Sequence, residues 1–365
     1  MKLLLSFNIK RACFLLFLGY LVVLTNNSTL VQGRKVISFN TDWKFNLADD
    51  PIFSKTVFDD SQWRSLNLPH DWSIEGKYDK SNSSGPHGGY LPCGIGWYRK
   101  TFSLPESEKG KRFFIRFDGV YMNSSVWINN RMVGSYPNGY NSFGYDITSF
   151  INFGDGQKNV VSAKVDNSLQ PASRWYSGSG IYRNIWLIST EQLHFKTNGV
   201  FVTTPEVSKE SATVHIDYHL IANAYPETVF NWTDNTSLFV WVNKKESKDQ
   251  KTNDRVQKKC TLSSAFFDQR GNEVARKVSE HLIGDFTEPY IQVELMVKNP
   301  NLWSAKTPSM YRLVSTISYD DKIIDQLETP IGIRKLEFTP EKGMLVNGVQ
   351  EKLKGICFYQ SMGCL

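Results

Sequence analysis

The sequence is poor in cysteine and histidine. It has five cysteines and six histidines in 365 residues, the histidines are scattered, and no two cysteines form a CxxC pair. Disulfide-dense folds and zinc sites need these residues in larger number or at closer spacing. We therefore expect no disulfide framework, no metal site and no cofactor. Cys357 and Cys364 are left open, either as a pair or as buried free thiols.

Long apolar runs are also scarce. The single long run, residues 12–24, follows three basic residues and precedes small residues at Val31 and Gly33. This order is typical of a signal peptide, so we expect residues 1–33 to be removed and the protein to be exported, either to the periplasm or outside the cell. The alternative is an N-terminal membrane anchor, for which the run is short. We expect no membrane span after cleavage.

Basic stripes with interleaved aromatic residues are absent, which argues against a nucleic-acid partner. The one basic run, residues 243–259, also contains acidic residues and is typical of a solvated hairpin or long loop. The Gly- and Ser-rich stretch 81–98 has no GK[ST] ending, so it is not a phosphate-binding loop. It predicts a long mobile loop that carries His87, Tyr90 and Trp97.

Long segments with helical periodicity are missing as well. Short alternating runs separated by turn residues take their place, and they predict an all-β chain of sandwiches or jelly rolls. Asn129-Asn130 is suited to a tight hairpin turn between two of these runs. The expected strands include residues 112–120, 124–136, 158–167, 181–188, 199–207, 211–223, 291–300 and 311–319.

Seven strings occur in order along residues 39–338. They are "FNTDWKFNL", "FDDSQWRSLNLPHDWSIEG", "GGYLPCGIGWYRKTF", "FIRFDGVYMNSSVWINNRMVGSYPNGYNSFGYDIT", "SRWYSGSGIYRNIWL", "NPNLWSAKTPSMYRL" and "IGIRKLEF". Together they resemble glycoside hydrolase family 2, which contains β-galactosidases, β-glucuronidases and β-mannosidases. The β-galactosidase-like branch is the most similar.

The resemblance implies an architecture. A jelly-roll sugar-binding domain would cover residues 34–190, and an immunoglobulin-like β-sandwich would cover 191–335. Residues 336–365 would be the truncated start of a catalytic TIM barrel, with 354–358 as its first, buried strand. A TIM barrel needs about 250 residues, so the barrel is not expected to form.

The resemblance also implies a reaction. Family members hydrolyse O-glycosyl bonds with retention, using two carboxyl groups about 5–5.5 Å apart on the barrel. We therefore expect no catalytic residue in this chain and no activity of the chain alone. The positions that match a His-His-Asp triplet of this branch hold Tyr359, Gln360 and Ser361. This departure suggests a fragment, produced by natural truncation or by a faulty gene boundary.

Two loops carry the candidate substrate-binding residues. In "SRWYSGSGIYR", Arg174, Trp175 and Tyr176 precede two glycines, and in the family this loop borders the sugar site. Arg174 would donate to sugar hydroxyls and Trp175 would stack on a ring; alternatively, Arg174 forms a salt bridge and Trp175 packs beneath the loop. In "LPHDW", His70 and Asp71 form the second candidate pair. Their alternative is a structural hydrogen-bonded turn, because no nucleophile accompanies them.

The expected partner is a carbohydrate, namely a β-glycoside, of which a β-galactoside is one candidate. A second hypothesis is a non-catalytic carbohydrate-binding or accessory protein. A third is a non-functional remnant with an exposed strand that favours aggregation. The sequence specifies neither the sugar and its linkage nor the oligomeric state.

Overall fold

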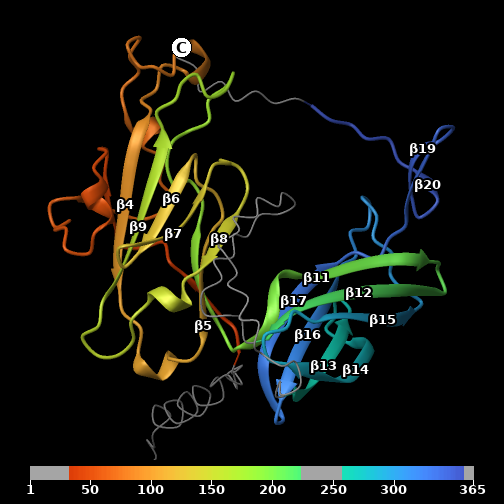
Figure 1. The fold of residues 1–365 in the computed structure, drawn as a ribbon. Coiled ribbons are helices and arrows are strands. Elements are labelled where there is room, and N and C mark those ends of the chain that lie inside the picture. Colours follow the sequence, from red (N-terminus) through yellow and green to blue (C-terminus); the bar gives the residue numbers. More distant parts are fainter. Residues whose placement is uncertain (1–32, 223–256, 357–365) are drawn as a thin grey trace, which may run out of the picture. The chain divides into compact units, whose positions relative to one another are not determined.

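The computed structural model describes residues 33–222 and 257–356. Residues 1–32 of the expected signal peptide, residues 243–256 of the basic run, and residues 357–365 with both Cys357 and Cys364 lie outside this range. The described chain is almost wholly antiparallel β-structure, as predicted (Figure 1). In these residues no helix is long and apolar enough to cross a membrane.

The first part of the chain folds into two sheets, which we call the first sandwich. One sheet has the order β3-β2-β4-β9-β6-β7 and the other has the order β1-β10-β5-β8. A single apolar cluster contains buried residues from both sheets, among them Trp43, Tyr98 and Phe117. The strands are β1 (Lys35–Ser38), β2 (Trp43–Asn46), β3 (Arg64–Leu66), β4 (Gly94–Phe102), β5 (Arg112–Phe117), β6 (Ser124–Ile128), β7 (Arg131–Tyr136), β8 (Phe143–Asp146), β9 (Asn159–Asn167) and β10 (Ile185–Thr190).

Short helical turns connect several of these strands. They are η1 (Pro51–Ser54), α2 (Trp72–Glu75), η2 (Pro86–Gly88), η3 (Glu106–Glu108) and η4 (Thr148–Phe150). The hairpin predicted at Asn129-Asn130 is confirmed between β6 and β7. Both residues have positive φ, 48° and 72°, as a two-residue hairpin turn of the mirror-image type requires.

The expectation of a mobile loop over residues 81–98 is wrong for its end. Strand β4 begins at Gly94, and Trp97 is 2% exposed. The indole of Trp97 stacks on Trp127 at 5.1 Å between ring centroids, and β4 pairs with β2 and β9. The central position of β4 in the sheet buries Trp97 and Tyr98.

The second part of the chain forms another pair of sheets, the second sandwich. Their orders are β11-β12-β15 and β14-β13-β16-β17. Strand β12 alternates buried and half-buried residues, as its sequence predicts, and its Tyr218 hydroxyl bonds to Ser264 and Ser315 in the opposite sheet. The strands are β11 (Leu193–Val207), β12 (Ser211–Ala222), β13 (Gln257–Phe267), β14 (Glu273–Gly284), β15 (Tyr290–Lys298), β16 (Tyr311–Tyr319) and β17 (Lys322–Ile331). Residues 257–259, expected in a solvated hairpin or a long loop, belong to β13, which agrees with the first alternative for these three residues.

A small sheet of β18 (Leu336–Thr339), β19 (Gly343–Val346) and β20 (Val349–Gln350) follows. The expected buried strand at residues 354–358 is not found in its described part. Residues 351–356 are not in a strand, and the Ile356 side chain is 90% exposed. The physical reason is that residues 354–356 have no strand pairing, and an apolar segment is buried only when a neighbouring layer covers it.

Candidate functional site

Asp71 connects the two loops that the sequence singled out. It caps α2, where its Oδ1 accepts a hydrogen bond from the Ser73 N–H at 2.9 Å. The same oxygen accepts from the Ser179 N–H at 2.9 Å, more than a hundred residues along the chain. Its Oδ2 accepts from the hydroxyl of Tyr176. One carboxylate therefore holds the end of the loop 168–184 against the turn that contains His70.

Burial and the Asp71 carboxylate raise the pKa of Tyr176 well above its usual range. The phenol therefore remains a hydrogen-bond donor at any physiological pH. Gly178 makes this contact possible, because its φ is +73° and a Cβ at this position would lie 2.5 Å from Asp71 Oδ2. The glycine spacing noted in the sequence thus has a direct structural cause.

His70 is buried and fully hydrogen-bonded. Its Nδ1 lies 2.7 Å from the Tyr98 hydroxyl, and its Nε2 lies 3.2 Å from Glu75 Oε2. Burial lowers the pKa of His70. Arg64, which binds the Glu75 carboxylate with both terminal nitrogens, lowers the pKa of Glu75 to about 2, and His70 assists. At neutral pH the site therefore contains a neutral imidazole beside an ionised carboxylate.

The turn and the loop also pair through their backbones. The N–H of His70 donates to the carbonyl of Ile181 at 2.9 Å, and the N–H of Trp72 donates to that of Ser179 at 3.0 Å. Gly180 has φ +132°, and a Cβ there would lie 2.6 Å from both the His70 carbonyl oxygen and the Tyr98 hydroxyl. The structure therefore brings His70, Asp71 and Tyr176 together, as parts of one hydrogen-bonded support.

Arg174 and Trp175 lie on the exposed side of the loop. Trp175 is 53% exposed, so it does not pack beneath the loop. Its indole N–H donates to the Tyr140 hydroxyl at 3.3 Å. Arg174 is exposed, and within the described residues no salt bridge or hydrogen bond to its guanidinium is recorded. Of the five predicted residues, these two present their side chains to solvent.

Sequence reasoning missed Tyr140. It lies in the turn "PNGYN", where Asn138 Oδ1 accepts from the N–H groups of Tyr140 and Asn141 at 2.7 and 3.2 Å. An aromatic residue in a turn built by Asn and Gly is a usable signal, because such a ring has little core to enter. Its link to Trp175 is not visible in the sequence.

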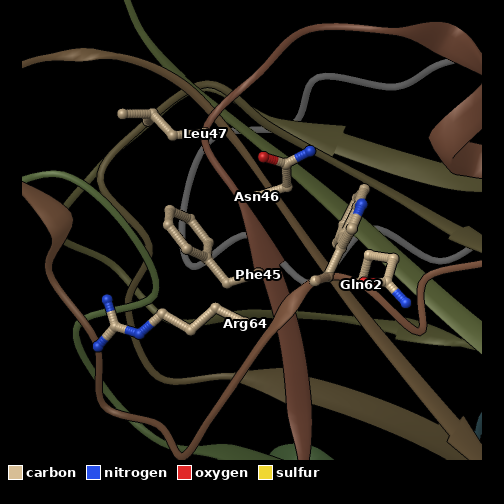
Figure 2. Close-up of a pocket in the computed structure, with 6 residues that line it drawn as sticks. Phe45, Asn46, Leu47, Gln62 and Arg64 are labelled. Atoms are coloured by element: carbon tan, nitrogen blue, oxygen red, sulfur yellow. The ribbon is translucent and has the colours of Figure 1, made fainter.

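An open hollow lies along β2 and β3, with a volume of about 510 Å³ (Figure 2), and it shares Arg64 with the group around His70. Its lining contains aromatic, amide, leucine and arginine side chains but no carboxylate. It therefore does not supply the pair of carboxyl groups that glycoside hydrolysis requires. The lining residues are Phe45, Asn46, Leu47, Gln62, Trp63 and Arg64.

Metal-ligating side chains do not cluster in the part of the chain that the structure describes. No group of three or more His, Cys, Asp or Glu residues there is placed to share a metal ion. Cys93 and Cys260 are free thiols, the first half-buried and the second buried. Burial raises the pKa of Cys260 to about 11, so this thiol is protonated at neutral pH.

Comparison with known proteins matches both sandwiches to models of one family. The model "Glycosyl hydrolases family 2, sugar binding domain" matches residues 36–191, and "Glycosyl hydrolases family 2" matches residues 198–334. A β-galactosidase of Bacteroides ovatus is 40% identical over 93% of this chain, and the match covers 36% of that protein. A β-glucuronidase of Bacteroides fragilis is 28% identical over 93% of this chain and 44% of its own length.

Solved structures give the same result. A glycosyl hydrolase family 2 member from Bacteroides cellulosilyticus aligns with a TM-score of 0.75 and 36% identity, over 89% of this chain and 38% of the other. A β-glycosidase from Bacteroides vulgatus aligns with a TM-score of 0.74 and 34% identity, over 89% and 37% of the two chains. The chain thus spans between a third and a half of the length of these relatives.

Proposed function

The chain belongs to glycosyl hydrolases family 2, and from this premise we propose that it is the sugar-recognising portion of a glycoside hydrolase that cleaves O-glycosyl bonds of a β-glycoside. A β-galactoside is the first candidate, because the 40% identical relative is a β-galactosidase. The observation that carries the proposal is the match of both sandwiches to this family over residues 36–334. The proposal includes the division into a sugar-binding domain, 34–190, and an immunoglobulin-like domain, 191–335.

We assign the five candidate residues two kinds of role. Arg174 and Trp175, which are exposed, would contact the sugar: the guanidinium would donate to hydroxyl groups and the indole would cover an apolar ring face. His70, Asp71 and Tyr176 are committed to hydrogen bonds within the chain. They would act as positioning residues that fix the loop on which Arg174 and Trp175 lie.

The chemistry itself would come from outside the described residues. Retaining hydrolysis needs a carboxylic acid that protonates the leaving oxygen and a carboxylate that attacks the anomeric carbon. None of the sheets in residues 33–222 and 257–356 closes into a barrel that could carry such a pair. We also propose that the protein is exported, with residues 1–33 as its signal peptide.

Purified residues 34–365 test this proposal on a panel of aryl β-glycosides: galactoside, glucuronide, mannoside and glucoside. We expect folded protein and no hydrolysis, since the chain contributes recognition only. Turnover of one substrate that survives removal of contaminating glycosidases would mean that the two sandwiches contain the catalytic carboxylates. The role assigned to the chain would then be wrong.

A second function is favoured by one observation, the exposure of an aromatic residue in a loop of the sugar-binding domain. Trp175 is 53% exposed although its loop is anchored by Asp71. A non-catalytic carbohydrate-binding protein would use the same residue. The two functions predict different results when this chain is joined to the catalytic portion of a family 2 enzyme. The first predicts glycoside hydrolysis by the combined protein, and the second predicts sugar binding without hydrolysis.

A further inference from the structure

Aromatic rings from two separate loops meet at the exposed end of the Trp175 side chain. Trp175 and Tyr140 are each 53% exposed, and the indole N–H of Trp175 donates to the Tyr140 hydroxyl at 3.3 Å. Two large rings that are half-exposed and joined at their polar tips leave apolar surface in water. A ligand with one apolar face and a polar rim would cover this surface without stranding the polar tips of the rings.

Tyr140 packs against a buried residue of the first sandwich. Its ring meets the buried ring of Tyr121 edge to face, with 5.5 Å between centroids and 70° between planes. Gly139 allows this contact, because a Cβ at that position would lie 2.2 Å from the Tyr121 ring. The Tyr182 hydroxyl donates to the Gly139 carbonyl at 2.8 Å. Three contacts therefore fix the turn: the Tyr121 ring, the Tyr182 hydroxyl and the side chain of Asn138.

The loop that carries Trp175 is also joined through its backbone to the segment that supports Tyr140. Tyr121, in the connection from β5 to β6, and Gly180 exchange two hydrogen bonds of 2.9 Å, N–H to carbonyl in each direction. Asp71 holds Ser179 and Tyr176 on the same segment. Binding to such a surface needs little further ordering, and this lowers the entropic cost of recognition.

We propose that Tyr140 is a second sugar-contacting residue, and that Tyr140 and Trp175 form one two-ring platform for the apolar face of a pyranose ring. This rests on the proposed function, because it takes sugar recognition as its premise, and it adds a residue that the family strings did not single out. The C–H face of the sugar packs on the rings, and its equatorial hydroxyls remain at the rim. Arg174, which is exposed and precedes Trp175 in the chain, would donate to them.

The test is a sugar titration of the ¹⁵N-labelled chain, followed by the indole N–H signals of its tryptophans. Trp175→Phe identifies the Trp175 signal by its loss. Methyl β-galactoside, β-glucoside and β-glucuronide are the probes. We expect saturable shifts of the Trp175 signal, and association constants reduced about tenfold in both Tyr140→Ala and Trp175→Ala, the scale of one lost ring contact.

Phe201→Ala is the matched control, because Phe201 is an exposed aromatic residue, 60% exposed, on β11 of the second sandwich. We expect it to bind like the unchanged chain. Tyr140→Leu retains apolar bulk against Tyr121, so it supplies the same comparison if Tyr140→Ala fails to fold. We expect it to bind as weakly as Tyr140→Ala, since it has no ring.

Three results would overturn the inference: no saturable binding by the folded chain, unchanged binding in both Tyr140 variants, or an equal loss in Phe201→Ala. Binding of the glucuronide alone, abolished by Arg174→Ala but not by Trp175→Ala, would also overturn it, since charge rather than the rings would then recognise the ligand. Hydrolysis by the purified chain would contradict the proposed function but would not test the two-ring platform. The proposed function and the platform can therefore be contradicted by different results.

Discussion

At the scale of single residues, the site depends on groups that accept several hydrogen bonds at once. The Asp71 carboxylate accepts from two backbone N–H groups and from the Tyr176 hydroxyl. A carboxylate suits this position because it provides only acceptors and its charge strengthens each bond. Removing it would leave three donors to find new partners.

Asp71→Ala should lower the free energy of unfolding by about 2–3 kcal/mol, the combined cost of a lost helix cap and of stranded donors. Urea unfolding at neutral pH measures the change. Asp79→Ala is the matched control: Asp79 also caps its own turn through Ser81 but is exposed, so we expect a clearly smaller loss. Equal losses in the two variants would contradict the role given to Asp71.

His194 makes the stability of the chain depend on pH. Burial, with Arg34 nearby, lowers the pKa of His194 to about 4. Its Nδ1 lies 2.9 Å from the Glu191 carbonyl oxygen, so the neutral ring donates there. In the unfolded chain His194 binds a proton near pH 6.5, whereas in the folded chain it binds one only near pH 4. Stability should therefore fall as the pH drops from about 6.5 towards 4.

We expect His194 to account for a loss on the order of 2–3 kcal/mol between pH 7.5 and pH 4.5. Urea unfolding of the unchanged chain and of His194→Gln at both pH values measures it. The variant is less stable at pH 7.5 but should lose less on acidification by that amount. Parallel losses in the two proteins would show that His194 does not contribute to the pH dependence.

At the scale of elements, the loop 168–184 is shaped by close backbone approaches. Gly180 lies between the His70 carbonyl and the Tyr98 hydroxyl, with 2.6 Å from each to the position of a Cβ. Its φ of +132° is a second reason for glycine. The loop keeps its path because two elements, the His70 turn and β4, leave no space for a side chain there.

Gly180→Ala should therefore destabilise the chain by more than about 2 kcal/mol, since both contacts must give way and the backbone is strained. Gly156→Ala separates the two effects. Gly156 also has positive φ, +75°, but a Cβ there would meet nothing within 4 Å, so about 1 kcal/mol is expected. Thermal unfolding of both variants measures the difference. An equal loss of stability in both would show that the close contacts at Gly180 do not add to the cost of the substitution.

Strands with a clear two-residue alternation could be predicted from the sequence. β12 and the β6–β7 hairpin are examples, because one face of each is buried and a turn signal marks the end. β8 was missed, since all four of its residues are buried and no alternation remains. β1 was missed for the opposite reason: all four of its residues are exposed. Trp97 was assigned to a loop because the glycines before it hide the start of β4.

For the site, the sequence could supply the candidate residues but not their contacts. The motif strings selected Asp71 and Tyr176 separately, and their hydrogen bond joins positions 105 residues apart. Tyr140 was missed because its role depends on Trp175 in another loop. Long-range pairings of this kind follow from the sheet order, which local patterns do not determine.

At the scale of the whole molecule, one buried ion pair joins residues far apart in the chain. Arg34 donates to both carboxylate oxygens of Asp325, at 3.1 and 3.0 Å, and the Phe195 N–H donates to Asp325 at 2.7 Å. The Asp325 side chain is fully buried, and Arg34 is 10% exposed. A buried charge without its partner is costly, so both residues depend on the pair.

Asp325→Asn should lower the free energy of unfolding by about 3 kcal/mol, because Arg34 would keep its charge in a buried position. Arg34→Met should cost a similar amount. The double variant Arg34→Met with Asp325→Leu should lose less than the sum of the two single changes. Urea unfolding of the four proteins measures the coupling; additive losses would mean that the pair is not a unit.

The role proposed for the chain is to recognise the sugar for a family 2 glycoside hydrolase whose chemistry lies elsewhere. The most direct test is a chimera in which residues 34–334 replace the matching segment of the Bacteroides ovatus β-galactosidase. We predict hydrolysis of an aryl β-galactoside by the chimera, with KM raised about tenfold by Trp175→Ala and kcat changed little, since lost ring stacking weakens binding. A folded chimera with no activity, or one whose KM is unchanged by Trp175→Ala, would contradict the claim.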